Sequence, residues 1–317
     1  MNSKEFVRRR RHLMDLVGAN GIAVLAAAPE RVRSRDTLHV YRADSDFYYL
    51  TGFTEPDAVA VLVPGRPQGQ FLLFCRERNP ERELWDGPRA GPEGAVAEHG
   101  ADDAFPITDL DDILPGLLER SDRVYYSLGA HDFDQRLLSI IQTLNSKRQS
   151  GHAPSELVAL DHLLHEMRLY KSRAEAAVMR QSARIAVAAH KRAMSVCRPG
   201  MKEYELEAEF LHEFRRHGAE CSYPAIVAGG ANACVLHYRA NNAELKDGDL
   251  VLIDAGCEHE MYASDVTRTF PVNGRFSPAQ RELYDVVLEA NHAATAKAVA
   301  GNHWNDPHDA AVGVVTC

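Results

Sequence analysis

The first half of the chain alternates short apolar runs with a longer segment of helical periodicity. Apolar runs of strand length lie at 21–28, 58–64, 70–76 and 123–129. Residues 132–147 instead repeat apolar positions at a spacing of three and four, as an amphipathic helix does. Strands that alternate with helices predict an α/β (α+β) fold for this part of the chain.

A helix-start signal divides the chain near its middle. Ser172 and Glu175 form a capping box, in which a serine at the cap is followed three residues later by a glutamate. A long run of helix-forming residues follows it. We therefore predict two domains, one over residues 1–171 and a second over residues 172–317.

The second half begins with helices and continues with strands. After the helix that starts at Ser172, a second helix is predicted over 202–218. Two hairpins are then expected, one turning at 229–232 and the other around 258–261. A further capping box, formed by Ser277 and Gln280, predicts another helix.

Composition narrows the class of protein. The 317 residues are 45% hydrophobic and 26% charged, as in soluble globular proteins. The net charge of −9 argues against binding to nucleic acid or to a membrane surface, because both require a basic face. No run approaches the roughly 20 apolar residues of a membrane span. Six scattered cysteines without a CxxC motif favour reduced core thiols, so we expect a cytoplasmic protein.

Two aspartates interrupt an apolar, β-branched stretch at 248–272, although strands normally exclude aspartate. If this stretch is a hairpin that turns at 258–261, Asp254 lies directly opposite Asp265. Two facing carboxylates repel each other unless a cation lies between them. Hard oxygen ligands suit Mn²⁺ or Mg²⁺, and such a site can hold two ions. In the alternative interpretation, one aspartate pairs with Arg268 and the other caps a turn.

Several motifs resemble one family of enzymes. "YRADSDFYYLTGF" at 41–53, "LHEMRLYKSRAE" at 164–175 and "DLVLIDAGCEHEMYASDVTRTFPV" at 249–272 are similar to aminopeptidase P (Xaa-Pro aminopeptidase), a pita-bread metallopeptidase. The resemblance is collinear over essentially the whole chain. It implies an aminopeptidase-P-type (creatinase-like) α/β domain, followed by an incomplete pita-bread catalytic domain of which residues 172–317 form the N-terminal half.

The resemblance also implies an activity and roles for three residues. Family members release the first residue of peptides that have proline in second position. Asp254 would chelate one metal and Asp265 would bridge two, typically Mn²⁺, which hold the attacking hydroxide. His237, in "VLHYRAN", matches the histidine near the scissile bond. Taken alone, His237 would instead be interpreted as a solvent-facing histidine at a strand end.

Three further residues are weaker candidates for substrate binding. Tyr223 is expected to line the pocket, although a packed strand tyrosine is an equal alternative. Asp36 and Trp85 match positions that close the active site of a neighbouring subunit, which implies a dimer or tetramer for the full-length protein. Without the resemblance, Asp36 would be a solvated loop carboxylate and Trp85 an ordinary core or interface residue.

The chain departs from the family pattern at its end. The resemblance requires one further histidine and two glutamates as ligands, and no matching motif precedes Cys317. If the polypeptide is complete, we expect it to be inactive and poorly stable; a frameshift, an early stop and a partial gene model remain open. Two other functions are alternatives: a prolidase that cleaves Xaa-Pro dipeptides, and a non-catalytic pita-bread module that binds peptides. The two aspartates count against the latter.

Overall fold

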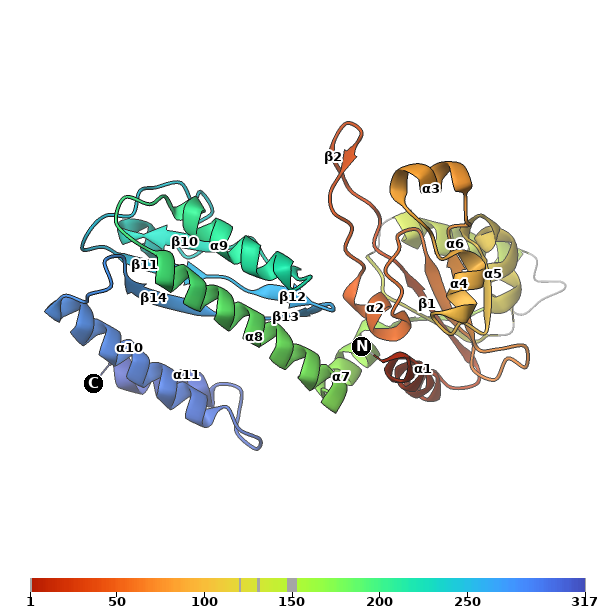
Figure 1. Ribbon diagram of the computed structural model, residues 1–317. Coiled ribbons are helices and arrows are strands. Elements are labelled where there is room, and N and C mark those ends of the chain that lie inside the picture. Colours follow the sequence, from red (N-terminus) through yellow and green to blue (C-terminus); the bar gives the residue numbers. More distant parts are fainter. Residues whose placement is uncertain (1, 120, 130–131, 147–152, 317) are drawn as a thin grey trace. The chain divides into compact units, whose positions relative to one another are not determined.

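The computed structural model describes residues 2–119, 121–129, 132–146 and 153–316 (Figure 1). The chain divides into two compact units, Met1–Ala176 and Ala177–Cys317, with the division five residues after the predicted domain boundary at 171. Among the described residues, no helix is both long and apolar enough to cross a membrane.

The first unit is built on a six-stranded sheet in the order β6-β5-β4-β1-β7-β8. Strand β1 pairs in parallel with β7 and antiparallel with β4, and β7 and β8 are also parallel. The four predicted strands are all present, as β1, β4, β5 and β7. The strands of this unit are β1 (Gly21–Ala26), β2 (Val32–Ser34), β3 (Thr37–Leu38), β4 (Val59–Leu62), β5 (Phe71–Cys75), β6 (Asp103–Pro106), β7 (Arg123–Tyr126) and β8 (Glu156–Ala159).

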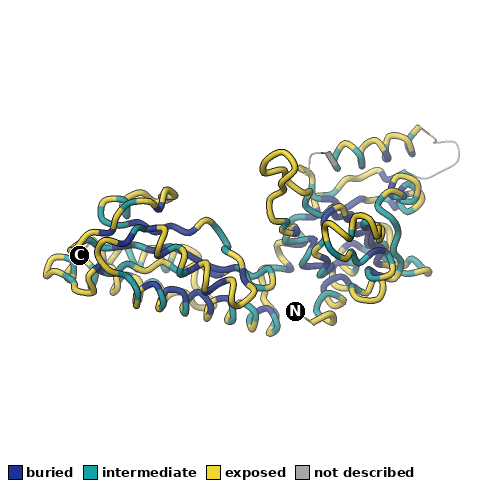
Figure 2. The backbone as a smooth tube through the Cα atoms, turned by 45° about the horizontal axis from the view of Figure 1, so that its top comes forward, coloured by how far each residue is buried: buried dark blue, intermediate teal, exposed yellow. Residues whose placement is uncertain are grey.

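Helices cover both faces of this sheet. The side chains of its strands alternate between two apolar cores, one on each face. In β1, Ala23 and Leu25 join the core with α1, α2, α4 and α7, while Ile22 and Val24 join the core with α5 and α6. Figure 2 colours the backbone by burial, with the buried positions in dark blue. The helices are α1 (Ser3–Val17), α2 (Ser45–Thr51), α3 (Pro80–Asp86), α4 (Gly91–Ala97), α5 (Leu110–Leu118), α6 (Asp132–Ser146) and α7 (Asp161–Leu169), with a 3₁₀ turn at Ile107–Asp109.

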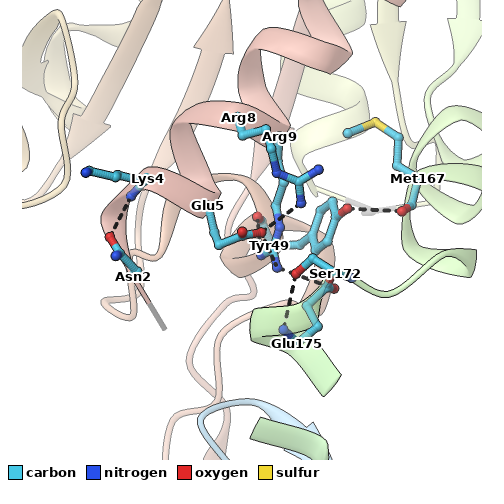
Figure 3. Close-up of polar contacts among 9 residues, drawn as sticks. All are labelled: Asn2, Lys4, Glu5, Arg8, Arg9, Tyr49, Met167, Ser172 and Glu175. Atoms are coloured by element: carbon cyan, nitrogen blue, oxygen red, sulfur yellow. Dashed lines mark hydrogen bonds and ion pairs between the residues drawn. The ribbon is translucent and has the colours of Figure 1, made fainter. Parts of the chain in front are cut away.

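A buried arginine ties α1 to the beginning of the next helix, α8 (Arg173–Val196) (Figure 3). Arg9 is 1% exposed and lies 3.3 Å from the Glu175 carboxylate. It also donates to the backbone oxygen of Tyr49 at 3.0 Å. The predicted capping box is confirmed, since Ser172 and Glu175 exchange hydrogen bonds of 3.2 and 2.7 Å.

The second unit contains two three-stranded sheets, in the orders β10-β11-β14 and β13-β12-β9. Helices α8 and α9 pack on these strands through Ile185, Phe210, Val251 and Ile253, and α10 packs against α11. The elements after α8 are α9 (Glu203–Arg216), β9 (Glu220–Cys221), β10 (Ile226–Gly229), a 3₁₀ turn (Gly230–Cys234), β11 (Leu250–Asp254), β12 (Cys257–His259), β13 (Tyr262–Ala263), β14 (Thr267–Pro271), α10 (Pro278–Lys297) and α11 (Asp306–Val315).

The prediction of two hairpins is wrong in part. Strand β10 pairs with β11, and the segment after Gly229 forms a 3₁₀ turn and irregular backbone rather than a returning strand. The second hairpin exists, but it turns at Glu260 and Met261, both of which have positive φ (47° and 67°). A two-residue turn of this kind matches the twist of the strands. As a result Asp254 lies opposite Thr267, not opposite Asp265.

The described cysteines are all free, although not all lie in a core. Cys75 and Cys257 are buried, whereas Cys234 is exposed in the 3₁₀ turn after β10. Burial raises the pKa of the Cys75 thiol to about 12, which keeps it protonated and unreactive.

Candidate metal centre

The two aspartates are held close together despite the corrected register. Asp254 ends β11, in which Val251 and Ile253 face the buried core and leave Asp254 half-buried on the other face. Asp265 lies in the irregular link between β13 and β14 and is exposed. The pairing displaces the two carboxylates by two positions, which leaves them diagonal neighbours on one side of the strands.

Tyr223 connects the two carboxylates. Its hydroxyl lies 2.5 Å from Oδ1 of Asp254 and 2.8 Å from Oδ1 of Asp265. Burial raises the pKa of Tyr223 well above its usual value, and its contacts with both carboxylates raise it further, so the hydroxyl keeps its proton. Because a hydroxyl carries a single proton, it donates to only one carboxylate at a time.

The donor set fits a hard divalent cation. The hydroxyl of Tyr223 is neutral, so its hydrogen bonds leave the negative charge of both carboxylates available to a cation. Carboxylate oxygens are the ligands that Mg²⁺ and Mn²⁺ prefer. Asp254 and Asp265 are therefore the residues that would hold the metal, and Tyr223 would orient them through its hydroxyl.

A cavity of about 230 Å³ opens beside this pair. His237 reaches it from the irregular segment between β10 and β11 and is exposed. Of the predicted site residues, four meet here: His237, Tyr223, Asp254 and Asp265. Sequence reasoning missed the other lining residues, since nothing in the pattern separates them from ordinary loop residues; these are Pro224, Ile226 and Arg239.

A glycine sets how closely the aspartate-bearing strands approach. A Cβ atom added at Gly256 would lie 1.7 Å from the backbone oxygen of Ser264 and 2.8 Å from the hydroxyl of Ser222. The hydroxyl of Ser222 in turn donates to that same oxygen at 2.9 Å. Only glycine fits this close approach, which lies between Asp254 and Asp265.

The other two predicted site residues belong to the first unit. Trp85 lies in α3 and is 87% exposed, which excludes the core alternative. Asp36 lies in the exposed turn between β2 and β3. Neither lines the cavity described above.

A second group of possible ligands in the first unit was not predicted. Single ligand atoms of Asp46, Asp161 and His165 lie within 4.8 Å of one another. However, Arg168 already pairs with Asp46 at 2.5 Å, and His165 is exposed. We assign no function to this group, since the guanidinium of Arg168 already occupies the Asp46 carboxylate.

Comparison with known proteins matches both units. Residues 177–316 match the model of metallopeptidase family M24, and residues 6–125 match the N-terminal domain of aminopeptidase P. The Xaa-Pro aminopeptidase of Escherichia coli K12 is 46% identical over 294 residues, which are 92% of this chain and 67% of the relative.

Solved structures agree with this match. Aminopeptidase PepP of Pseudomonas aeruginosa superposes with a TM-score of 0.98 at 60% identity, covering 100% of this chain and 72% of that one. Aminopeptidase P from E. coli, solved with the inhibitor Pro-Leu, has a TM-score of 0.90 at 45% identity, covering 93% and 68% of the two chains. The predicted fold class is thereby confirmed. The chain belongs to the Xaa-Pro aminopeptidase (aminopeptidase P) family of M24 pita-bread metallopeptidases.

Proposed function

We propose that the protein releases the N-terminal residue from peptides with proline in second position, with Asp254 and Asp265 supplying two of the ligands of its Mn²⁺ ions. The observation that carries the proposal is the contact of one tyrosine hydroxyl with both carboxylates, at the edge of a cavity that His237 also lines. The proline-containing inhibitor bound by the E. coli relative supports the substrate class.

The chain's own residues have separate tasks in this proposal. When bound, two metal ions supply a nucleophile derived from water at near-neutral pH. Asp254 and Asp265 hold the ions, and the hydroxyl of Tyr223 keeps a carboxylate oriented toward the cavity. His237 donates a hydrogen bond to the scissile carbonyl oxygen as negative charge develops on it.

Proline in second position explains why a dedicated cavity is needed. The Xaa-Pro amide has no N–H to donate, and the proline ring locks φ. Recognition must therefore come from the shape and apolar surface that the ring meets. Pro224 and Ile226 offer such a surface beside the carboxylates.

We further propose that the protein functions as a homo-oligomer, with α3 and the β2–β3 turn at the subunit contact. Leu84 and Trp85 are 86% and 87% exposed on α3, and large exposed apolar side chains mark interaction surfaces. Asp36 and Trp85 would then complete the site of a neighbouring subunit. Size-exclusion chromatography with light scattering tests this, since Trp85→Ala should shift a dimer or tetramer toward monomer.

The activity is tested with three peptides and a metal titration. We expect Mn²⁺-dependent release of the first residue from an Xaa-Pro-Xaa tripeptide, and no release from a tripeptide without proline. Turnover of the Xaa-Pro dipeptide in preference to the tripeptide would support prolidase instead. Binding of Mn²⁺, followed by electron paramagnetic resonance, gives a second readout that needs no turnover.

A matched pair of variants connects both readouts to the site. Asp254→Asn should weaken Mn²⁺ binding by about tenfold or more, because an amide replaces a charged ligand. Asp285→Asn makes the same chemical change in an exposed ion pair with Arg281 on α10 and should alter neither readout. Equal Mn²⁺ binding in the wild type and both variants would refute the metal centre.

A further inference from the structure

A buried carboxylate accepts four hydrogen bonds from the segment that carries His237. Glu203, the first residue of α9, is 0% exposed. Its Oε1 accepts from the amide N–H of Gly229 at 2.8 Å and from the side chain of Asn232 at 3.1 Å. Its Oε2 accepts from the hydroxyl of Tyr238 at 2.8 Å and from the N–H of Ala243 at 2.9 Å. Two donors at each oxygen saturate the group.

These contacts require the charged form of Glu203. Burial alone raises the pKa of its carboxyl, but the four donated hydrogen bonds together outweigh burial and hold the pKa below its ordinary value. A buried charge is tolerated only where such partners surround it, and losing them would leave it uncompensated. Glu203 and its donors therefore form one unit.

The donors bracket a segment that has no strand pairing of its own. Gly229 precedes it, Ala243 follows it, and Tyr238 lies within it, directly after His237. Backbone of this kind, without a ladder of hydrogen bonds, depends on side chains for its shape. Glu203 supplies this support at both ends and in the middle.

A buried asparagine strengthens the same segment. Asn241 is 4% exposed and adopts the left-handed region, with φ of 43°. Its side chain accepts from Val227 N–H at 3.0 Å and donates to the backbone oxygen of Ala225 at 2.8 Å. The segment is thus attached to both α9 and β10. A residue other than glycine stays in this strained backbone conformation only where the surrounding contacts hold it there.

We propose that Glu203 is a positioning residue for His237: its carboxylate holds the 229–243 segment so that the histidine faces the carboxylate cavity. Glu203 does not line the cavity and acts through Tyr238, the chain neighbour of His237. The inference rests on the proposed role of His237 in substrate contact. It extends that role by naming what orients the imidazole.

The test follows the segment and the imidazole separately, by NMR of the full chain. In Glu203→Gln, the amides of Gly229 and Ala243 should exchange about tenfold faster or more, because each loses a bond to a charged acceptor. The ring resonances of His237 should shift and gain relaxation typical of a mobile side chain. Glu209→Gln, the same change on the same helix at a residue paired with Arg192, should leave His237 unaltered.

Several outcomes overturn the inference. Faster exchange at Gly229 and Ala243 with an unmoved His237 resonance would make Glu203 a structural residue only. If Glu203→Gln does not fold, Tyr238→Phe decides, because it removes one of the four contacts beside His237 and should shift the same resonance. An unmoved resonance in that variant overturns the inference.

Kinetics keep this inference distinct from the proposed function. In turnover of an Xaa-Pro-Xaa peptide, Glu203→Gln should lower kcat by about tenfold, with a smaller change in KM, since His237 is misoriented rather than removed. If His237→Ala leaves turnover unchanged, the proposed role of His237 fails. The NMR comparison would still decide whether Glu203 orients it.

Discussion

Gly256 gives the sharpest test of how the aspartates are brought together. In Gly256→Ala, the added methyl group would lie 1.7 Å from the backbone oxygen of Ser264 and 2.5 Å from its carbonyl carbon. Real Cβ contacts are essentially never below 3.0 Å, so the two backbones must separate by about 1.3 Å (3.0 minus 1.7). Neither side can relieve the clash by rotating a side chain.

The magnitude follows from what this separation disrupts. Inserting a methyl group into a packed site commonly costs about 1–3 kcal/mol. Here the displaced Ser264 oxygen also accepts from Ser222 at 2.9 Å, and Ser222 N–H donates to the Gly256 oxygen at 3.0 Å. We therefore expect Gly256→Ala to lower the free energy of unfolding by about 3 kcal/mol, the upper end of this range. Asp265 follows Ser264 directly, so its distance from Asp254 should change as well.

Urea unfolding measures the loss of stability, and Mn²⁺ binding reports the changed distance between Asp254 and Asp265. Gly313→Ala is the matched control, since Gly313 lies inside α11 with no atom within 4 Å of an added Cβ. That control should be neutral or stabilise by about 0.5–1 kcal/mol, because alanine favours helix. If Gly256→Ala unfolds at the wild-type urea concentration and binds Mn²⁺ equally well, the close approach does not hold the site.

Other parts of the fold give further expectations. Glu175→Gln leaves the buried Arg9 guanidinium beside a neutral amide, so we expect the free energy of unfolding, measured with urea, to fall by about 3 kcal/mol. A fall of less than about 1 kcal/mol would contradict a stabilising ion pair. Ser277→Ala removes the cap of α10 and should cost about 1 kcal/mol, seen as faster amide exchange at Gln280; unchanged exchange would argue against the cap. For Glu203, the folded pKa lies below 4.5, so the unfolded chain takes up the proton first. Its contribution is complete above pH 4.5 and is lost as pH falls; the stability gap between wild type and Glu203→Gln should therefore narrow on acidification, and a constant gap would contradict this.

Hydrophobic periodicity predicted the interior of the first unit well and its edges poorly. Strands β1, β4, β5 and β7 are apolar because both of their faces are buried under helices. Strands β6 and β8 were missed. They lie at the two ends of the sheet, where β6 is only half-buried and β8 mostly exposed, so their residues carry little apolar pattern.

The segment between β10 and β11 was mispredicted for a different reason. Residues 223–238 read as a hairpin because apolar residues stand on both sides of two glycines. In the structure, the side chains of Asn232 and Tyr238 in the second half of that stretch donate instead to Glu203, a residue on another element. A contact between positions about 30 residues apart leaves no trace in local periodicity, so His237 was identified by its motif and not by its environment.

The carboxylate pair was predicted although its register was wrong, and strand geometry explains why. The centre of the turn was expected one residue earlier than between Glu260 and Met261, so every predicted partner is displaced by two positions. Side chains alternate with a period of two along a strand, and a displacement of two therefore returns each residue to the same face. A displacement of one would have placed Asp254 and Asp265 on opposite faces, out of reach of a common hydroxyl. The contact of Tyr223 with both aspartates thus shows that the two carboxylates lie on the same face, whatever the register of the strands. A metal ion shared by the two carboxylates requires only that they lie on the same face.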